Sequence, residues 1–380
     1  EELKNLKGKK AVLVVGGGSM KKQGFLDRAV AYLKEAGMEV QLIEGVEPDP
    51  SVETVMKGAA VMREFEPDWI VAMGGGSPID AAKAMWAFYE YPEITFEDLI
   101  TPFSFPELRQ KAKFAAIPST SGTATEVTAF SVITDYAKGI KYPLADFNIT
   151  PDVAIVDSEL VEGLPAKQVA YTGMDALTHA IEAYIGRSTT KQTRKAAIEA
   201  IQLIFDNLQT AYKNGNDKTA RRNMLRASYL AGTAFTKSYV GYVHAVAHSL
   251  GGCYGIPHGL ANSVLLPIVL KAYGTAAHKK LARLARITGI SDSKLDAVAA
   301  EEFINHIRSM NISMNIPETL DGIRNEDIPK LACYADKEAN PLYPVPALWG
   351  PEKLEQMHHL VQEVSEHDRN RNSEHPGKAA

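Results

Sequence analysis

The chain of 380 residues carries a formal net charge of −5, and its residues are 45% hydrophobic and 23% charged. This balance is typical of a folded soluble protein of two or three domains, and it excludes a disordered chain, a collagen-like fibre and a disulfide-stabilised miniprotein. No apolar run approaches the roughly 18 residues of a membrane span, and the net negative charge gives no basic surface for nucleic acid, so we expect neither as a partner. Two cysteines are too few for a disulfide framework, so we expect a cytoplasmic protein.

The first residues form a basic stretch followed by an apolar run at 11–15, a pattern that superficially resembles a signal peptide. The run is too short for one, and the glycine-rich sequence at 16–19 is not a small-residue cleavage site. We therefore predict a first β-strand at 11–15. Because the chain opens on glutamate rather than methionine, we expect further residues upstream of Glu1.

Short apolar runs alternate with helical periodicity over the first 165 residues. The predicted strands lie at 11–15, 40–43, 69–73, 114–117, 130–134 and 153–156. One helix is predicted at 25–34, and a second opens at Asp49-Pro50, where an N-cap residue precedes a proline. A third helix begins after Ser77, which has capping-box spacing to Asp80. Buried strands that alternate with helices indicate a doubly wound parallel sheet, an α/β domain of Rossmann-like type.

The sequence pattern changes after Pro165: helical periodicity dominates, and strand-like apolar runs nearly vanish. The clearest helical stretches lie at 176–184, 196–212, 221–235 and 264–272. We therefore predict an α/β domain over residues 1–165 and an all-helical domain over residues 166–380. The polar stretch at 366–380 is expected to fray.

Histidines and one aspartate recur at a metal-binding spacing in the helical half. Asp175 and His179 are four residues apart on a predicted helix, and His244 and His248 repeat that spacing. His258 follows where a loop enters the next helix. An isolated pair of this kind is more often a hydrogen-bonded polar pair, but the combination favours Fe²⁺ or Zn²⁺. Spacing alone leaves open which four of the five side chains would bind the ion.

Two loops that follow predicted strands could hold a nucleotide. The sequence Gly74-Gly75-Gly76-Ser77 opens a helix, where amides without a Cβ can approach a diphosphate at the positive helix end. It is not the usual Gly-x-Gly-x-x-Gly fingerprint, and a tight turn explains it equally well. The loop at 118–126 is dense in hydroxyl groups, although solvated serine and threonine turns are also common.

Together these segments resemble the iron-containing (group III) alcohol dehydrogenases, including bacterial butanol dehydrogenases, over nearly the whole chain. The matching motifs lie in order at 74–83, 117–126, 173–179 and 244–262. The resemblance implies a nucleotide-binding domain followed by a helical metal domain. It also implies reversible hydride transfer between NAD(P)H and a small primary alcohol or aldehyde, and a homodimer or higher homo-oligomer. The family usually has a leading segment that would precede residue 1.

By motif position, the resemblance assigns the metal to Asp175, His179, His244 and His258. It places His248 near the nicotinamide, as a catalytic residue that relays a proton or positions the substrate. Fe²⁺ is the expected ion, and Zn²⁺ or another divalent metal suits the same ligands.

The resemblance likewise implies the cofactor contacts. Contacts to the diphosphate and ribose fall on Gly75, Gly76, Ser77 and Asp80. Positions that line the adenine, ribose and nicotinamide fall on Ser119, Thr120, Thr123, Thr128, Lys141 and Leu160. Taken alone, Lys141 would be interpreted as a surface lysine.

One departure from the family bears on cofactor choice. Members often carry an aspartate after the first strand, which bonds the adenosine ribose and repels a 2′-phosphate, but Gly17 stands there in this chain. Gly18 and Ser19 offer an amide and a hydroxyl to a phosphate, and Lys21 and Lys22 lie close by. We therefore expect NADP(H) rather than NAD(H).

Four rival interpretations stay open. A zinc polyol dehydrogenase of the glycerol type and a dehydroquinate-synthase-like enzyme share the structural superfamily, but such relatives generally use fewer metal ligands. A metal hydrolase would leave both loops unexplained, and the chain has no His-Glu-x-x-His run. A nucleotide-binding protein without catalysis would bind the cofactor but no metal.

Overall fold

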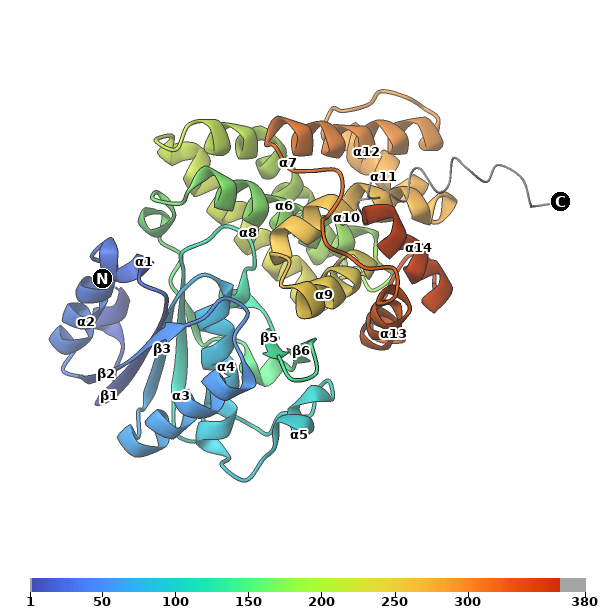
Figure 1. Cartoon of the computed structure of the whole chain (residues 1–380). Helices are drawn as coiled ribbons and strands as arrows, with labels where there is room; N and C mark the ends of the chain where they lie inside the picture. The colour runs from blue at the N-terminus through green and yellow to red at the C-terminus, as the bar shows by residue number, and fades with distance from the viewer. Residues whose placement is uncertain (1, 363–380) are drawn as a thin grey trace.

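A five-stranded parallel sheet forms the N-terminal half of the molecule in this computed structural model, which describes residues 2–362 (Figure 1). In spatial order β2-β1-β3-β4-β7, the strands are β1 (Lys10–Gly16), β2 (Glu39–Val46), β3 (Trp69–Gly74), β4 (Lys113–Pro118) and β7 (Val153–Ala154). Every neighbouring pair is parallel, so the connections cross over the sheet. The predicted α/β class is confirmed. The stretch predicted to fray, 366–380, lies outside the described residues.

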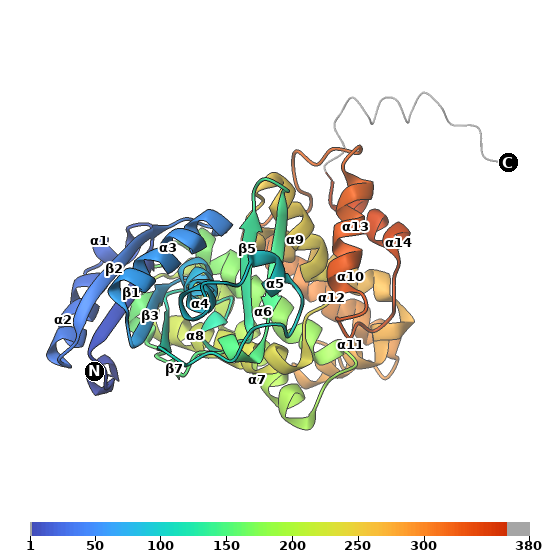
Figure 2. The same ribbon diagram turned by 90° about the horizontal axis from the view of Figure 1, so that it is seen from below.

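Helices cover both faces of this sheet because its strands are apolar on both sides (Figures 1 and 2). In β1, Val12 and Val14 pack into the core beneath α3 (Val52–Phe65) and α4 (Gly76–Glu90). Leu13 points the other way, into the core beneath α2 (Phe25–Glu35). The remaining short elements of this half are α1 (Ser19–Lys22), α5 (Phe96–Ile100), η1 (Glu2–Asn5), η2 (Thr125–Val127), η3 (Phe147–Ile149) and η4 (Ser158–Val161).

The predicted strand at 130–134 forms, but it does not belong to the parallel sheet. It is part of β5 (Phe130–Asp135), which pairs with the antiparallel strand β6 (Ile140–Ala145) as a separate hairpin. The sequence analysis missed β6 because Pro143 interrupts its apolar pattern. The hairpin contacts α4 through β5 and α9 through β6, so it connects the two halves of the molecule beside the site.

The second half is helical, as predicted, and begins at Ala166 directly after Pro165. Its helices are α6 (Ala166–Ile185), α7 (Lys191–Lys213), α8 (Lys218–Ser238), α9 (Tyr242–Tyr254), α10 (His258–Tyr273), α11 (Thr275–Ile287), α12 (Asp296–Ser313), α13 (Ile328–Ala339) and α14 (Pro351–Val361). Helix α6 lies at the centre, packed against α7, α8 and α10, and its residues from Gly173 to Ile185 are all buried. Asp175 and His179 therefore lie on the buried part of α6.

Among residues 2–362, no single helix is long and apolar enough to cross a membrane. Helices α10 and α11 satisfy those criteria only as a pair, and they are bent by 117° relative to each other.

Candidate active site

One cavity of about 180 Å³ collects side chains from both halves of the chain. The first half contributes the start of α4, the hydroxyl-rich loop and the hairpin. The second half contributes α6, α8, α9, α10 and the segment after α13. The lining residues include Asp49, Gly76, Ser77, Asp80, Thr123, Thr128, Phe130, Lys141, His179, Phe235, Val240, His244, His248, His258 and Tyr343.

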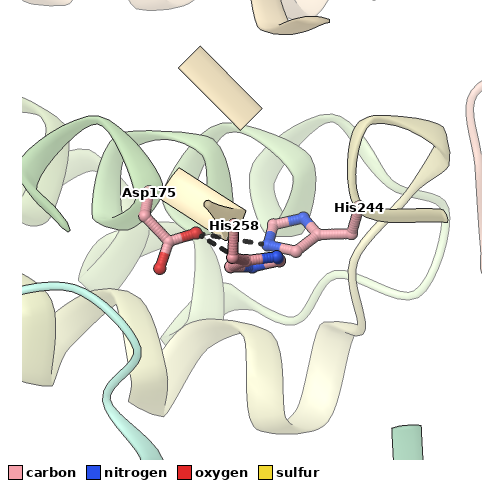
Figure 3. A group of neighbouring side chains, drawn as sticks. All are labelled: Asp175, His244 and His258. Carbon is pink, nitrogen blue, oxygen red and sulfur yellow. Dashed lines mark ion pairs between the residues drawn. The ribbon is translucent and has the colours of Figure 1, made fainter. Parts of the chain in front are cut away.

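Three predicted metal ligands point toward one another beside this cavity (Figure 3). Asp175 on α6, His244 on α9 and His258 at the start of α10 each offer a ligand atom, and these atoms lie within 4.8 Å of one another. Asp175 Oδ1 is 3.3 Å from His258 Nε2 and 3.7 Å from His244 Nε2. Although burial alone would raise it, His179 and His258 hold the pKa of Asp175 well below its ordinary value. Burial lowers the pKa of His258, so an anionic oxygen and a neutral imidazole converge there.

The surroundings of Asn262 test whether a cation fits between these groups. Its Nδ2 lies 2.7 Å from Asp175 Oδ1, 3.2 Å from His244 Nε2 and 3.1 Å from His258 Nε2. Its Oδ1 is buried without a hydrogen-bond partner. Three ligand atoms thus converge on one electropositive amide nitrogen. A divalent cation requires the same convergence of electron-pair donors. The donor set therefore fits a metal ion.

His179, the fourth predicted ligand, lies beside this group rather than within it. Its Nδ1 is 4.0 Å from Asp175 Oδ2 and is buried without a partner. Its ring stacks on Phe235 and on His244, with centroids 4.1 and 4.4 Å apart. Burial lowers the pKa of His179 to about 3, so the ring is neutral and its lone pair is available. The assignment of His179 as a ligand stays a prediction.

Glu182, which the sequence analysis did not identify, orients His244. Its Oε2 lies 2.6 Å from His244 Nδ1, and its two oxygens accept hydrogen bonds from the backbone amides of Gly241 and Val243, both at 2.8 Å. Although burial alone would lower it, Asp175 and Glu182 raise the pKa of His244 to about 9. Without a metal ion both ring nitrogens of His244 are therefore protonated at neutral pH. A bound ion would displace the proton on Nε2, which faces Asp175, while the Nδ1 proton stays on the bond to Glu182, as is usual where a carboxylate orients a metal-binding histidine.

The glycines at the start of α4 bring the helix end close to the hydroxyl-rich loop. A Cβ at Gly76 would lie 2.8 Å from Thr123 Cγ2, and one at Gly75 would lie 3.2 Å from Thr120 Cγ2. Gly75 is the N-cap of α4, and no side chain caps the helix there. The open helix end on the cavity is therefore a cradle for an anionic group that a larger residue would fill.

Gly76→Ala is expected to raise KM for NADPH by about tenfold while metal binding stays unchanged, because the methyl group pushes Thr123 into the cradle. Gly350→Ala is the matched control, since Gly350 caps α14 and its Cβ would meet open space. Initial rates over a range of NADPH concentrations give KM, and an unchanged KM would show that the cradle does not hold the cofactor.

Two family models match the chain in sequence order. The model of iron-containing alcohol dehydrogenases matches residues 1–158, and the C-terminal model of the same family matches residues 169–358. The NADPH-dependent butanol dehydrogenase of Clostridium saccharobutylicum is 59% identical over 320 residues, which span 84% of this chain and 82% of that protein. The chain belongs to the iron-containing alcohol dehydrogenase family.

Other relatives of this alcohol dehydrogenase agree in sequence and fold. The 1,3-propanediol dehydrogenase of Klebsiella pneumoniae is 40% identical over 351 residues, 90% of this chain and 88% of that protein. A crystal structure of a 1,3-propanediol oxidoreductase superposes with a TM-score of 0.87 at 37% identity, covering 95% of this chain and 93% of that one. The predicted family, fold class and alcohol oxidoreductase activity are confirmed.

Two buried side chains hold the hydroxyl-rich loop of this alcohol dehydrogenase in place. Lys83 donates to Thr125 Oγ1 at 3.0 Å and to the carbonyl oxygens of Thr128 and Phe130, both at 2.8 Å. Asp80 accepts from the Thr125 hydroxyl at 2.5 Å and from the backbone amide of Val132 at 3.0 Å. The predicted ribose contact Asp80 thus has both oxygens engaged in anchoring the loop.

Glu126, in the same loop, has a buried Oε1 without a partner, and burial raises its pKa from 4.5 to about 7. The folded protein therefore holds a proton that the unfolded chain releases, so stability is fully present below pH 4.5 and is lost as pH rises through 7. Glu126→Gln stays neutral at every pH. We expect it to be more stable than the parent at pH 8, by up to about 3 kcal/mol, and equally stable at pH 4.5.

Thermal unfolding of both proteins at the two pH values measures this difference. Glu64→Gln, at an exposed position on α3, is the matched control and should behave as the parent does. An equal melting-temperature difference for Glu126→Gln at both pH values would contradict the expectation.

The other predicted cofactor residues are divided between the cavity and its surroundings. Lys141 is not a surface lysine: its side chain is 2% exposed, and its Nζ pairs with Asp49 Oδ1 at 2.7 Å. Thr123, Thr128, Gly76 and Ser77 line the cavity. Ser119 and Thr120 follow β4, and Gly17, Gly18 and Ser19 follow β1 at the same edge of the sheet. Leu160 lines a separate cavity of about 70 Å³ over α2, so the structure does not bring it to the metal side.

Proposed function

We propose that this alcohol dehydrogenase interconverts small primary aldehydes and alcohols, with NADPH as the preferred cofactor and a divalent metal ion at Asp175, His179, His244 and His258. The observation that carries the proposal is that one cavity combines these histidines, His248 and the glycine cradle of α4. Separate metal and nucleotide sites would not support hydride transfer. A shared cavity can hold the reacting groups in contact.

The walls of the cavity support a small apolar substrate. Phe130, Phe235, Val240 and Tyr343 line it beside the histidines. An alkyl chain can pack against these side chains while its oxygen faces the metal ligands. The butanol dehydrogenase and the 1,3-propanediol dehydrogenase among the relatives act on alcohols of this size, by their names.

In the proposed reaction, Asp175, His179, His244 and His258 would hold the metal ion, which would supply Lewis-acid polarisation of the substrate oxygen, and the glycine cradle of α4 would hold NADPH, the source of the hydride. Asp175 and His258 supply the anionic and neutral ligand atoms, and Glu182 holds His244 in the matching orientation. His248 donates a proton to the oxygen during aldehyde reduction and removes it during alcohol oxidation.

The end of β1 supports NADPH. Gly17, Gly18 and Ser19 are exposed and place no carboxylate where a 2′-phosphate would lie. Lys22 adds an exposed positive charge, whereas Lys21 pairs with Glu44 at 3.2 Å. The butanol dehydrogenase relative is named as NADPH-dependent.

Initial-rate kinetics with butanal tests the proposal. We expect kcat/KM to be at least about tenfold higher for NADPH than for NADH, and the rate to vanish after chelation. Comparable values for the two cofactors would contradict the NADPH assignment alone. No turnover of butanal or related aldehydes with either cofactor would contradict the proposed activity.

We also propose a homo-oligomer in the cytoplasm. β2 is an edge strand of the sheet, and its unpaired side can receive a second copy. Cys253 and Cys333 are free and exposed, which suits a reducing compartment. Light scattering coupled to size-exclusion chromatography measures the oligomeric state, and a monomer at micromolar concentration would contradict the first point.

A further inference from the structure

Glu338 connects two side chains of the cavity wall that come from different segments. Its Oε1 lies 2.8 Å from His248 Nδ1 and accepts the Tyr343 hydroxyl at 2.8 Å. Glu338 is on α13 and His248 is on α9, and these helices pack against each other. The side chain of Glu338 is 11% exposed, so water competes little for this oxygen.

The hydrogen bond to Glu338 determines which nitrogen of His248 can act. Because a carboxylate accepts but cannot donate, His248 carries a proton on Nδ1. Nε2 is then the ring nitrogen left for the cavity that His248 lines. The ring is also stacked against His258, with centroids 5.0 Å apart and an interplanar angle of 21°, so its plane is fixed as well as its tautomer.

The second bond holds an aromatic side chain of the cavity wall. Tyr343 is 2% exposed and lines the same cavity, and it belongs to the segment between α13 and α14. One carboxylate oxygen therefore holds both the proposed proton donor and an aromatic wall residue.

We propose that Glu338 is a positioning residue for the proton-transfer step, acting by holding His248 with Nε2 toward the substrate oxygen. The inference rests on the proposed function: in aldehyde reduction the imidazolium form of His248 gives its Nε2 proton to the oxygen, keeps the Nδ1 proton on the bond to Glu338, and regains an Nε2 proton from solvent. A group that orients a catalytic histidine in this way affects turnover without touching substrate.

The experiment combines Glu338→Ala and Glu338→Gln with His248→Ala in a double-mutant cycle, using NADPH and butanal. We expect Glu338→Ala to lower kcat by about 10- to 100-fold, with KM for NADPH and metal content unchanged. In the His248→Ala background the same substitution should change kcat by less than about twofold. Glu338→Gln, whose amide oxygen can still accept the Nδ1 proton, should recover most of the loss.

Two further readouts separate positioning from a structural effect. The solvent deuterium isotope effect on kcat should increase in Glu338→Ala, because proton transfer becomes more rate-limiting. Asp336→Asn changes the same charge on the same helix without contacting His248 and should match the parent enzyme.

An equal loss from Glu338→Ala in the parent and in the His248→Ala background would overturn the inference while leaving the proposed function intact. An unchanged isotope effect in Glu338→Ala would overturn it too. An unchanged rate in His248→Ala alone would overturn the relay in the proposed function, and the inference with it. If Glu338→Ala does not fold, Glu338→Leu, which keeps the apolar part of the side chain but cannot accept from His248 Nδ1, takes its place in the cycle. A loss from Glu338→Leu that is equal in the parent and in the His248→Ala background then decides against the inference.

Discussion

Replacing His258 with alanine is expected to abolish metal binding and alcohol dehydrogenase activity together, while NADPH still binds. His258 comes from the start of α10 and supplies one of the three ligand atoms that converge around Asn262 Nδ2. Without it, the convergent group loses one of its three ligand atoms. Since the ion contributes several kcal/mol to stabilising the transition state, activity should fall by at least about 10³-fold.

Elemental analysis and a fluorescence titration with NADPH measure the two outcomes separately. The cofactor should bind with near-normal affinity, because α4 and the hydroxyl-rich loop lie in the first half of the chain. His359→Ala is the matched control, an exposed histidine on α14 that should leave both properties unchanged. A His258→Ala protein that keeps its metal, or keeps full activity without one, would refute the ligand assignment.

His248→Ala is expected to have the opposite combination: the metal stays bound and turnover falls by about 10²- to 10⁴-fold. His248 is four residues from His244 on α9, yet its Nδ1 bonds to Glu338 and not to the group formed by Asp175, His244 and His258. The spacing in sequence is that of a metal-binding pair, but the two rings have different hydrogen-bond partners, Glu182 for His244 and Glu338 for His248.

Metal content and steady-state kcat of His248→Ala check this expectation. Loss of the ion would move His248 into the ligand set, and an unchanged kcat would show that another group moves the proton. The comparison with His258→Ala is informative because both are cavity histidines whose loss removes the same number of atoms.

Much of the fold could be predicted because apolar runs and helical periods are local signals. The strands at 11–15 and 69–73 are continuous apolar runs, and both form buried strands of the parallel sheet. The hairpin could not be predicted in the same way. β6 contains Pro143, and β5 looks like any other strand, so only the three-dimensional pairing of Val132 with Pro143 reveals a separate sheet.

The metal site was predictable to a similar degree, and for a similar reason. Asp175 and His179 are one helical turn apart, and so are His244 and His248, so spacing alone marks each pair as a candidate metal-binding pair. Spacing could not distinguish ligand from neighbour, however. The convergent group contains Asp175, His244 and His258. The His248 ring stacks on His258, and His179 Nδ1 lies 4.0 Å from Asp175 Oδ2, so the choice of ligands among the five side chains stays a prediction.

The supporting carboxylates were missed because their partners are distant in sequence. Glu182 and His244 are 62 residues apart, and Glu338 and His248 are 90 apart. Glu182 had one usable signal, since it lies three residues after His179 and shares its face of α6. Glu338 had none, because a glutamate in a charged helix is ordinarily interpreted as part of a solvated face. Lys83 was missed likewise, although it is fully buried.

Metal dependence is tested by the NADPH-dependent reduction of butanal by protein purified without oxygen, followed through chelation and metal restoration in parallel with elemental analysis. We expect the purified protein to contain a divalent metal ion, its removal to abolish NADPH oxidation, and Fe²⁺ or Zn²⁺ to restore it. Reduction of butanal at an undiminished rate with no metal bound would show that the reaction needs no metal ion.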